Sequence, residues 1–140
     1  MLLDHTAFLP SDQKKIDALI GPSFSLLDKI KMLGVGSEKM QLLAYSTYFK
    51  EVINKHQQTN YGSIELRTAG VIVHFNNGKS YYVWCIPFYR LSVYRTETLN
   101  IHGEGEVVKF KIDKNQNKTF LRNLLRQLAI YQERFDSPFS

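Results

Sequence analysis

The sequence predicts an α+β protein in which N-terminal helices pack against a strongly bent antiparallel sheet that a C-terminal helix closes. The apolar residues follow a helical spacing up to residue 57, alternate with a period of two over residues 62–112, and return to a helical spacing afterwards. The links between the alternating segments are too short for parallel crossovers. With 140 residues, 44% of them hydrophobic, the chain has the size of one globular unit.

The first 57 residues are predicted to form a helical segment that packs on the sheet. Ser11 is placed to cap a short helix that stops at Gly21, and Ser23 or Ser25 is placed to open a second one that ends at Gly34. A third, amphipathic helix is predicted over residues 37–56. Its buried face would carry Leu42, Tyr45, Phe49, Val52 and Ile53, and its exposed face Lys39, Lys50 and Asn54. A polar connector over residues 57–62 follows.

Residues 62–135 are predicted to form the sheet and the closing helix. About six short strands are expected, separated by turns at residues 68–70, 76–79 and 103–105, with Pro87 marking a break. The helix, at about 117–134, has one broad apolar stripe. The stripe consists of Phe120, Leu121, Leu124, Leu125, Leu128, Tyr131 and Phe135.

Three segments of this second part resemble a bacterial pleckstrin-homology-like (PH-like) domain. Residues 66–73 (LRTAGVIV) are similar to the family's Leu-Thr-x-x-x-Ile turn, and residues 86–92 (IPFYRLS) to its Ile-Pro-Tyr-x-x-Ile segment. Residues 99–112 and the leucine-rich helix complete the resemblance, which covers about residues 62–135. It implies a nearly barrel-shaped sheet of about six strands that binds partners. The turn at 68–70 lacks the long basic loop with which membrane-binding relatives hold a phosphoinositide.

Residue types argue against several classes of function. Cys85 is the single cysteine and lies in an apolar strand, so it forms no internal disulfide and is expected to be a buried hydrophobe. The four histidines have no metal-ligand spacing, and no nucleophile motif, phosphate loop or dinucleotide fingerprint occurs. We therefore assign no catalytic residue, metal or cofactor and expect a protein that is not an enzyme. An enzyme stays open as a third class of function.

The sequence also predicts a cytoplasmic protein. The longest apolar run, residues 81–88, has eight residues, well below the roughly 20 that a transmembrane helix needs. Asp4 stands where a secretory signal would be basic, and Pro10 follows before an apolar stretch accumulates. We expect no transmembrane segment and no export.

The formal charge of +5 comes from one region. Residues 107–134 contain seven basic and two acidic residues, while the rest of the chain is balanced. The candidate anion-binding patch consists of Lys109, Lys111, Lys118, Arg122 and Arg126. Such a patch would attract acidic lipid headgroups, nucleic acid or an acidic protein. The alternative, which we favour, is that these side chains only keep the surface soluble.

The strand at residues 81–86 has no polar face, so both of its sides need a cover. One side belongs to the core of the sheet. The N-terminal helices are expected to cover the other, through Leu42, Tyr45 and Phe49; otherwise Tyr82, Trp84 and Ile86 form a surface for a partner or a second copy. The function predicted from the sequence is a protein-interaction or assembly module. The alternative is a binder of anionic surfaces through the basic patch.

Overall fold

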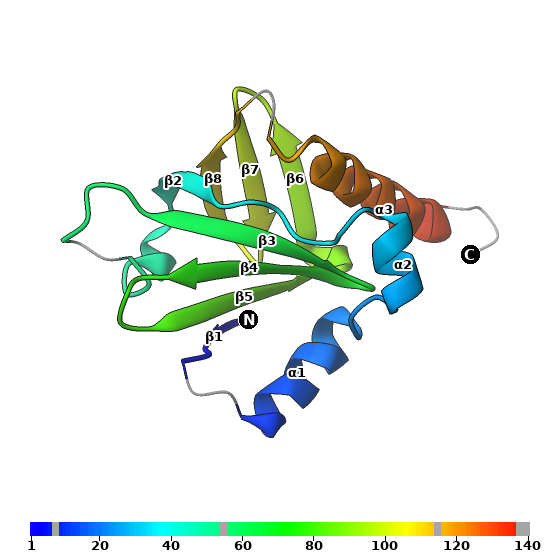
Figure 1. Cartoon of the computed structure of the whole chain (residues 1–140), viewed down its shortest axis with the longest axis horizontal. Coiled ribbons are helices and arrows are strands. Elements are labelled where there is room, and N and C mark those ends of the chain that lie inside the picture. The colour runs from blue at the N-terminus through cyan, green and yellow to red at the C-terminus, as the bar shows by residue number, and fades with distance from the viewer. Residues whose placement is uncertain (7–8, 54–55, 114–115, 137–140) are drawn as a thin grey trace.

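The computed structural model describes residues 1–6, 9–53, 56–113 and 116–136. Within them the chain forms eight β-strands, three α-helices and two short 3₁₀ helices (Figure 1). The helices are α1 (Pro10–Ile20), α2 (Leu26–Lys31), α3 (Lys118–Asp136), η1 (Thr47–Phe49) and η2 (Phe88–Arg90). The strands are β1 (Leu2–Asp4), β2 (Met40–Tyr45), β3 (Tyr61–Arg67), β4 (Gly70–Asn76), β5 (Tyr81–Pro87), β6 (Leu91–Arg95), β7 (Thr98–Gly103) and β8 (Glu106–Lys111). The α+β class is confirmed.

All eight strands belong to one antiparallel sheet with the order β1-β5-β4-β3-β2-β8-β7-β6. β2 joins its two halves, because Met40 and Gln41 pair with β3 whereas Leu42, Ala44 and Tyr45 pair with β8. The register shifts between Leu42 and Ala44, and a bulge of this kind bends a strand. Figure 1 shows the result: β6, β7 and β8 run across the direction of β3, β4 and β5. The sheet stays open, with β1 and β6 at its ends.

The main core fills the inner side of the bent sheet. Alternate residues of the strands supply it, among them Ile64, Val73, Trp84 and Phe110, which are all at most 1% exposed. α3 packs into the same core with one stripe of its surface. The buried residues of that stripe are Phe120, Leu121, Leu124 and Leu128. The predicted closing helix is thus confirmed, while Leu125 is exposed and the side chain of Phe135 lies outside the described part.

α1 covers the outer side of β4 and β5. Its buried Ile16 and Ile20 contact a second apolar cluster that contains Ile72, Val83 and Cys85. Gly70 has no room for a side chain at this contact, because a Cβ atom there would lie 2.7 Å from Cγ2 of Ile20 on α1 and 2.4 Å from the carbonyl oxygen of Ile86 on β5. An N-terminal helix therefore covers the apolar strand, as the sequence predicts, although the residues that do so are different ones.

Burial between α1 and β5 keeps the thiol of Cys85 protonated. Loss of hydration raises its pKa to about 11, against about 8.5 for an exposed thiol. We expect Ellman's reagent to leave the native thiol unmodified at mildly alkaline pH and to react at once in denaturant. Since the unfolded chain releases this proton first, stability should fall as the pH rises between the two values. Rapid modification of a protein whose circular dichroism stays native would contradict this.

The helix predicted over residues 37–56 is wrong. β2 and η1 lie in this segment, and Leu42, Phe49 and Val52 reach the main core from the strand, the 3₁₀ helix and the turn after it. Tyr45, expected on the buried face, is 43% exposed. The physical reason is the tertiary pairing of β2. Its backbone hydrogen bonds to β3 on one side and to β8 on the other stabilise the extended conformation, and they outweigh the local preference of this segment for a helix.

The strand count is also corrected, from about six to eight. β3 to β8 are the six predicted strands, and the added ones are β2 and the three-residue β1. The two short helices before residue 34 are confirmed, and Ser25 caps α2 by accepting a hydrogen bond from the backbone N–H of Asp28 at 3.2 Å. The predicted cap of the first helix is wrong, because α1 already begins at Pro10 and Ser11 lies inside it. Among the described residues of 1–57, the predicted helical character thus holds only for α1, α2 and the single turn η1. Asn54, predicted on the exposed face of the third helix, lies outside the described residues.

Candidate functional site

A chain of polar side chains crosses the outer face of the sheet beside α1. Tyr81 on β5 bonds to Nδ1 of His74 on β4, and Nε2 of His74 lies 3.4 Å from Oε1 of Glu65 on β3. The other carboxylate oxygen of Glu65 lies 3.8 Å from Nη1 of Arg67, which also pairs with Asp17 on α1. The network therefore links three strands and a helix.

The charges in this network depend on one another. The hydrogen bond from His74 is the main reason why the pKa of Glu65 is lowered, and it outweighs the opposing effect of burial. Burial, followed by the charge of Glu65, raises the pKa of Tyr81. Both ring nitrogens of His74 have a partner, the Tyr81 hydroxyl at Nδ1 and the Glu65 carboxylate at Nε2. These contacts tie β3, β4 and β5 together on the outer face of the sheet.

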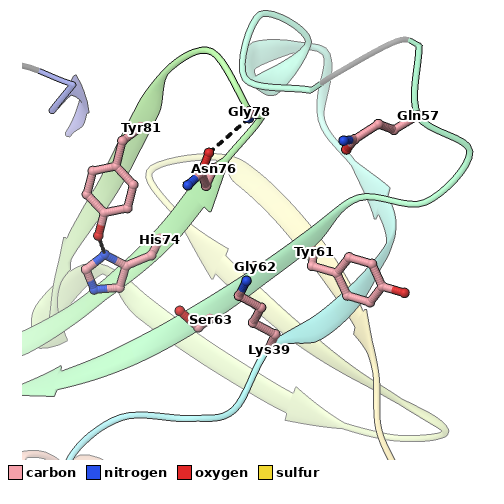
Figure 2. A pocket seen from close by; sticks show the side chains of 9 residues that line it. All are labelled: Lys39, Gln57, Tyr61, Gly62, Ser63, His74, Asn76, Gly78 and Tyr81. Atoms are coloured by element: carbon pink, nitrogen blue, oxygen red, sulfur yellow. Dashed lines mark hydrogen bonds between the residues drawn. The ribbon is translucent and has the colours of Figure 1, made fainter.

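A pocket of about 520 Å³ opens next to this network (Figure 2). In Figure 2, His74 and Tyr81 form one wall, and Asn76 accepts a hydrogen bond from the backbone N–H of Gly78 at 2.9 Å. The lining residues are Lys39, Gln57, Tyr61, Gly62, Ser63, His74, Asn76, Gly78 and Tyr81. Its polar groups suit hydrogen bonding to a small molecule. Within the described residues no group of three or more His, Cys, Asp and Glu side chains is arranged to hold a metal ion.

The five cations of the candidate patch are all exposed, but they lie in two groups. Lys109 and Lys111 alternate along β8 with the buried Val108 and Phe110, so they point away from the main core. α3 packs into that same core, on the inner side of the sheet. Lys118, Arg122 and Arg126 thus lie on the opposite side of β8 from the two lysines. Their spacing in the sequence suggests a single patch, whereas in the fold β8 separates the two lysines from the three cations of α3.

The proposed interaction surface of Tyr82, Trp84 and Ile86 needs a correction. Trp84 and Ile86 are 0% exposed and belong to the main core, and Tyr82 is partly buried against it. The alternation along β5 points these three residues inward and leaves Val83 and Cys85 for α1. None of the three therefore presents its side chain as a docking surface.

A groove between β6 and α3 offers a surface that the sequence analysis missed. Its volume is about 250 Å³, and it is lined by Leu91, Ser92, Val93 and Tyr94 of β6 and by Leu125, Leu128, Ala129 and Gln132 of α3. β6 is the last strand of the sheet and pairs with β7 on its other side. Leu125 and Tyr94 are 41% and 55% exposed. A signal was present in the sequence, since Leu91–Tyr94 contains no charge or proline to protect an edge strand.

No family model, curated protein or solved structure matches this chain. The PH-like resemblance therefore remains a prediction. In the described part of the chain, no helix combines the length and the apolar character needed to cross a membrane.

Proposed function

We propose that this chain is a non-enzymatic interaction module with a PH-like fold, and that it binds an extended segment of an acidic protein partner along β6. The observation that carries the proposal is the groove between the edge strand β6, whose residues 91–94 carry no charge, and α3. An open, bent antiparallel sheet with a helix packed into it supports the PH-like assignment. A bacterial cytoplasmic location stays a prediction from the sequence.

The free edge of β6 supplies the backbone part of this recognition. An extended segment that adds to a sheet edge gains main-chain hydrogen bonds, and pockets for alternate side chains add specificity. β6 has five residues, whereas β1 at the opposite end has three. The longer edge, which also has a groove beside it, is therefore the better template.

The basic residues of α3 supply the preference for an acidic segment. Arg122 lies three residues before Leu125 and seven before Ala129, and Lys118 lies seven before Leu125, so both are on the side of the helix that lines the groove. Arg126 follows along the same flank. These exposed cations attract acidic side chains and set the orientation of a bound segment.

Blocking the groove tests the proposal. Heptapeptides selected from a random displayed library should be acidic and should shift the amide resonances of β6 and α3. Ala129→Trp fills the groove from an exposed position and should weaken these peptides at least tenfold, and R122E/R126E should weaken them in a salt-dependent manner.

Ile130→Trp is the matched control, because Ile130 is exposed on α3 but does not line the groove. It should bind the selected peptides like the wild type. Selected peptides that shift resonances elsewhere, or that bind the Ala129→Trp protein unchanged, would refute a binding role for this edge.

A further inference from the structure

The outer side of β8, β7 and β6 is an exposed sheet surface. α1 packs on β4 and β5, and α3 packs on the inner side of the sheet, so in the part of the chain that the structure describes no helix covers this surface. Lys109 points to it, since it alternates with buried residues along β8. The register places Asn100 of β7 beside Lys109 and Tyr94 of β6 beside Asn100. Because directly paired residues share a face, a row with a cation and an aromatic ring crosses the three strands.

Two more cations and a second tyrosine continue this surface toward β3. Lys111 lies two residues after Lys109, on the same face of β8. Together with Lys39 and Tyr61 it lines a hollow of about 250 Å³ where β2 and β3 begin and β8 ends. Among the described residues that line this hollow, Asp113 is the single acid. We call Lys39, Tyr61, Tyr94, Lys109 and Lys111 the tyrosine–lysine face.

Solubility alone does not account for this combination of residues. A lysine that protects a sheet from aggregation belongs on an edge strand, whereas β8 lies between β2 and β7. Tyr94 and Tyr61 are 55% and 51% exposed, although a solubilising surface does not require exposed aromatic rings. In the described part of the chain, no carboxylate forms an ion pair with the ammonium groups of the three lysines. The charges and the rings are therefore available to a ligand.

Single-stranded nucleic acid is the polyanion that fits both parts of the tyrosine–lysine face. A single strand presents phosphates to lysines and flat bases to aromatic rings, and proteins that bind it combine a basic surface with stacking side chains. A duplex hides the faces of its bases, and an acidic lipid surface or an acidic peptide has no row of flat rings. The ring of His102 adds a further aromatic side chain beside the row, since it meets the ring of Tyr94 at 90° with a centroid distance of 5.2 Å.

We propose that the tyrosine–lysine face binds single-stranded nucleic acid, with its lysines on the phosphates and its two tyrosines stacked on bases. None of these contacts reads the edge of a base, so the binding has no strong sequence preference. Three phosphate contacts predict that the logarithm of the binding constant falls with the logarithm of the salt concentration with a slope of about −2. The face lies on the opposite side of the sheet from α3, and it shares only Tyr94 with the groove beside β6.

Fluorescence anisotropy of labelled oligothymidine and oligouridine, each of about 16 nucleotides, tests the proposal over a series of salt concentrations. The full chain should bind at low salt; binding of either probe supports the proposal, and the tighter one identifies the strand as DNA or RNA. K109E/K111E should weaken binding at least tenfold and flatten the slope to about −0.7, the value for the one remaining phosphate contact. R122E/R126E is the matched control, because it changes the net charge equally on the other side of the sheet and should keep the wild-type slope.

Removal of the rings tests the stacking contacts separately from the charges. Tyr61→Leu and Tyr94→Leu should each weaken binding of the single strand at least fivefold and leave the salt slope unchanged, because each removes a ring but no charge. Tyr89→Leu changes a tyrosine that is 63% exposed on η2, outside the tyrosine–lysine face, and should bind like the wild type. A duplex of the same length should bind more weakly than the single strand.

Three results would overturn the proposal: no binding of either probe at low salt, equal losses in K109E/K111E and R122E/R126E, or wild-type affinity in both tyrosine variants. Vesicles of phosphatidylserine and phosphatidylcholine provide a fourth test. If they bind the chain more tightly than the oligonucleotides do, and detach from K109E/K111E, the face is a membrane contact and the proposal is wrong.

Discussion

Replacing Trp84 by alanine is expected to destabilise the protein by about 3–5 kcal/mol, the usual cost of removing a large aromatic side chain from a core. Trp84 is 0% exposed, and its ring packs edge-on against Phe49 with a centroid distance of 4.7 Å. Because Phe49 in turn contacts Phe75 at 5.7 Å, the cavity would lie at the centre of an aromatic cluster. Globular proteins have a total stability of about 5–15 kcal/mol, so this variant should be marginal.

Urea unfolding followed by circular dichroism measures the effect, since Trp84 is the only tryptophan and the variant loses its fluorescence. Trp84→Phe is the control. The indole N–H of Trp84 is buried with no hydrogen-bond partner in the described part, so phenylalanine removes an unsatisfied donor while it keeps a ring. We expect this control to cost less than about 1.5 kcal/mol. Equal losses in both variants would show that ring packing is not the main contribution.

The fold of residues 62–136 was largely predictable from the sequence, because two local signals agree there. Alternation along β3 and β4 identifies their inner faces, and Asn76, Asn77 and Gly78 mark the hairpin that follows. The period then changes to 3.6 at α3. Where the apolar alternation and the turn residues indicate the same structure, the predicted strand boundaries agree closely with the observed ones.

β2 shows why the same reasoning failed earlier in the chain. Leu42, Phe49 and Val52 are buried, and their spacing suits one face of a helix. In the fold they reach the core from the strand β2, the 3₁₀ helix η1 and the turn that follows η1. Only the pairing of β2 with both β3 and β8 distinguishes the two possibilities, and that pairing is not encoded locally.

The candidate surfaces were less predictable, because they depend on which apolar side chains are buried by other elements of the fold. Trp84 and Leu26 both belong to apolar segments, yet one is 0% and the other 74% exposed. The charge spacing on α3 was visible in the sequence, whereas its separation from Lys109 by the sheet was not. The groove beside β6 requires knowing that this strand is an edge.

Replacing Arg67 by methionine is expected to loosen α1 from the sheet. Arg67 is 4% exposed, and its guanidinium pairs with Asp17 on α1 and donates a hydrogen bond of 3.0 Å to the carbonyl oxygen of Gly21 at the end of that helix. Hydrogen bonds to charged groups contribute about 1.5–3 kcal/mol. The larger cost of an isolated buried charge does not apply, because the Asp17 side chain is 42% exposed and regains water.

Cys85 reports whether the loss is local. α1 covers this thiol through Ile16 and Ile20, so its modification by Ellman's reagent should accelerate in Arg67→Met under conditions where the circular dichroism is still native. Arg95→Met removes an arginine from an exposed position at the end of β6 and should leave the rate unchanged. Arg67→Lys should fall between the wild type and Arg67→Met, because an ammonium keeps the charge but lacks the fork that reaches both Asp17 and Gly21. A wild-type modification rate in Arg67→Met would mean that apolar packing alone holds α1 on the sheet.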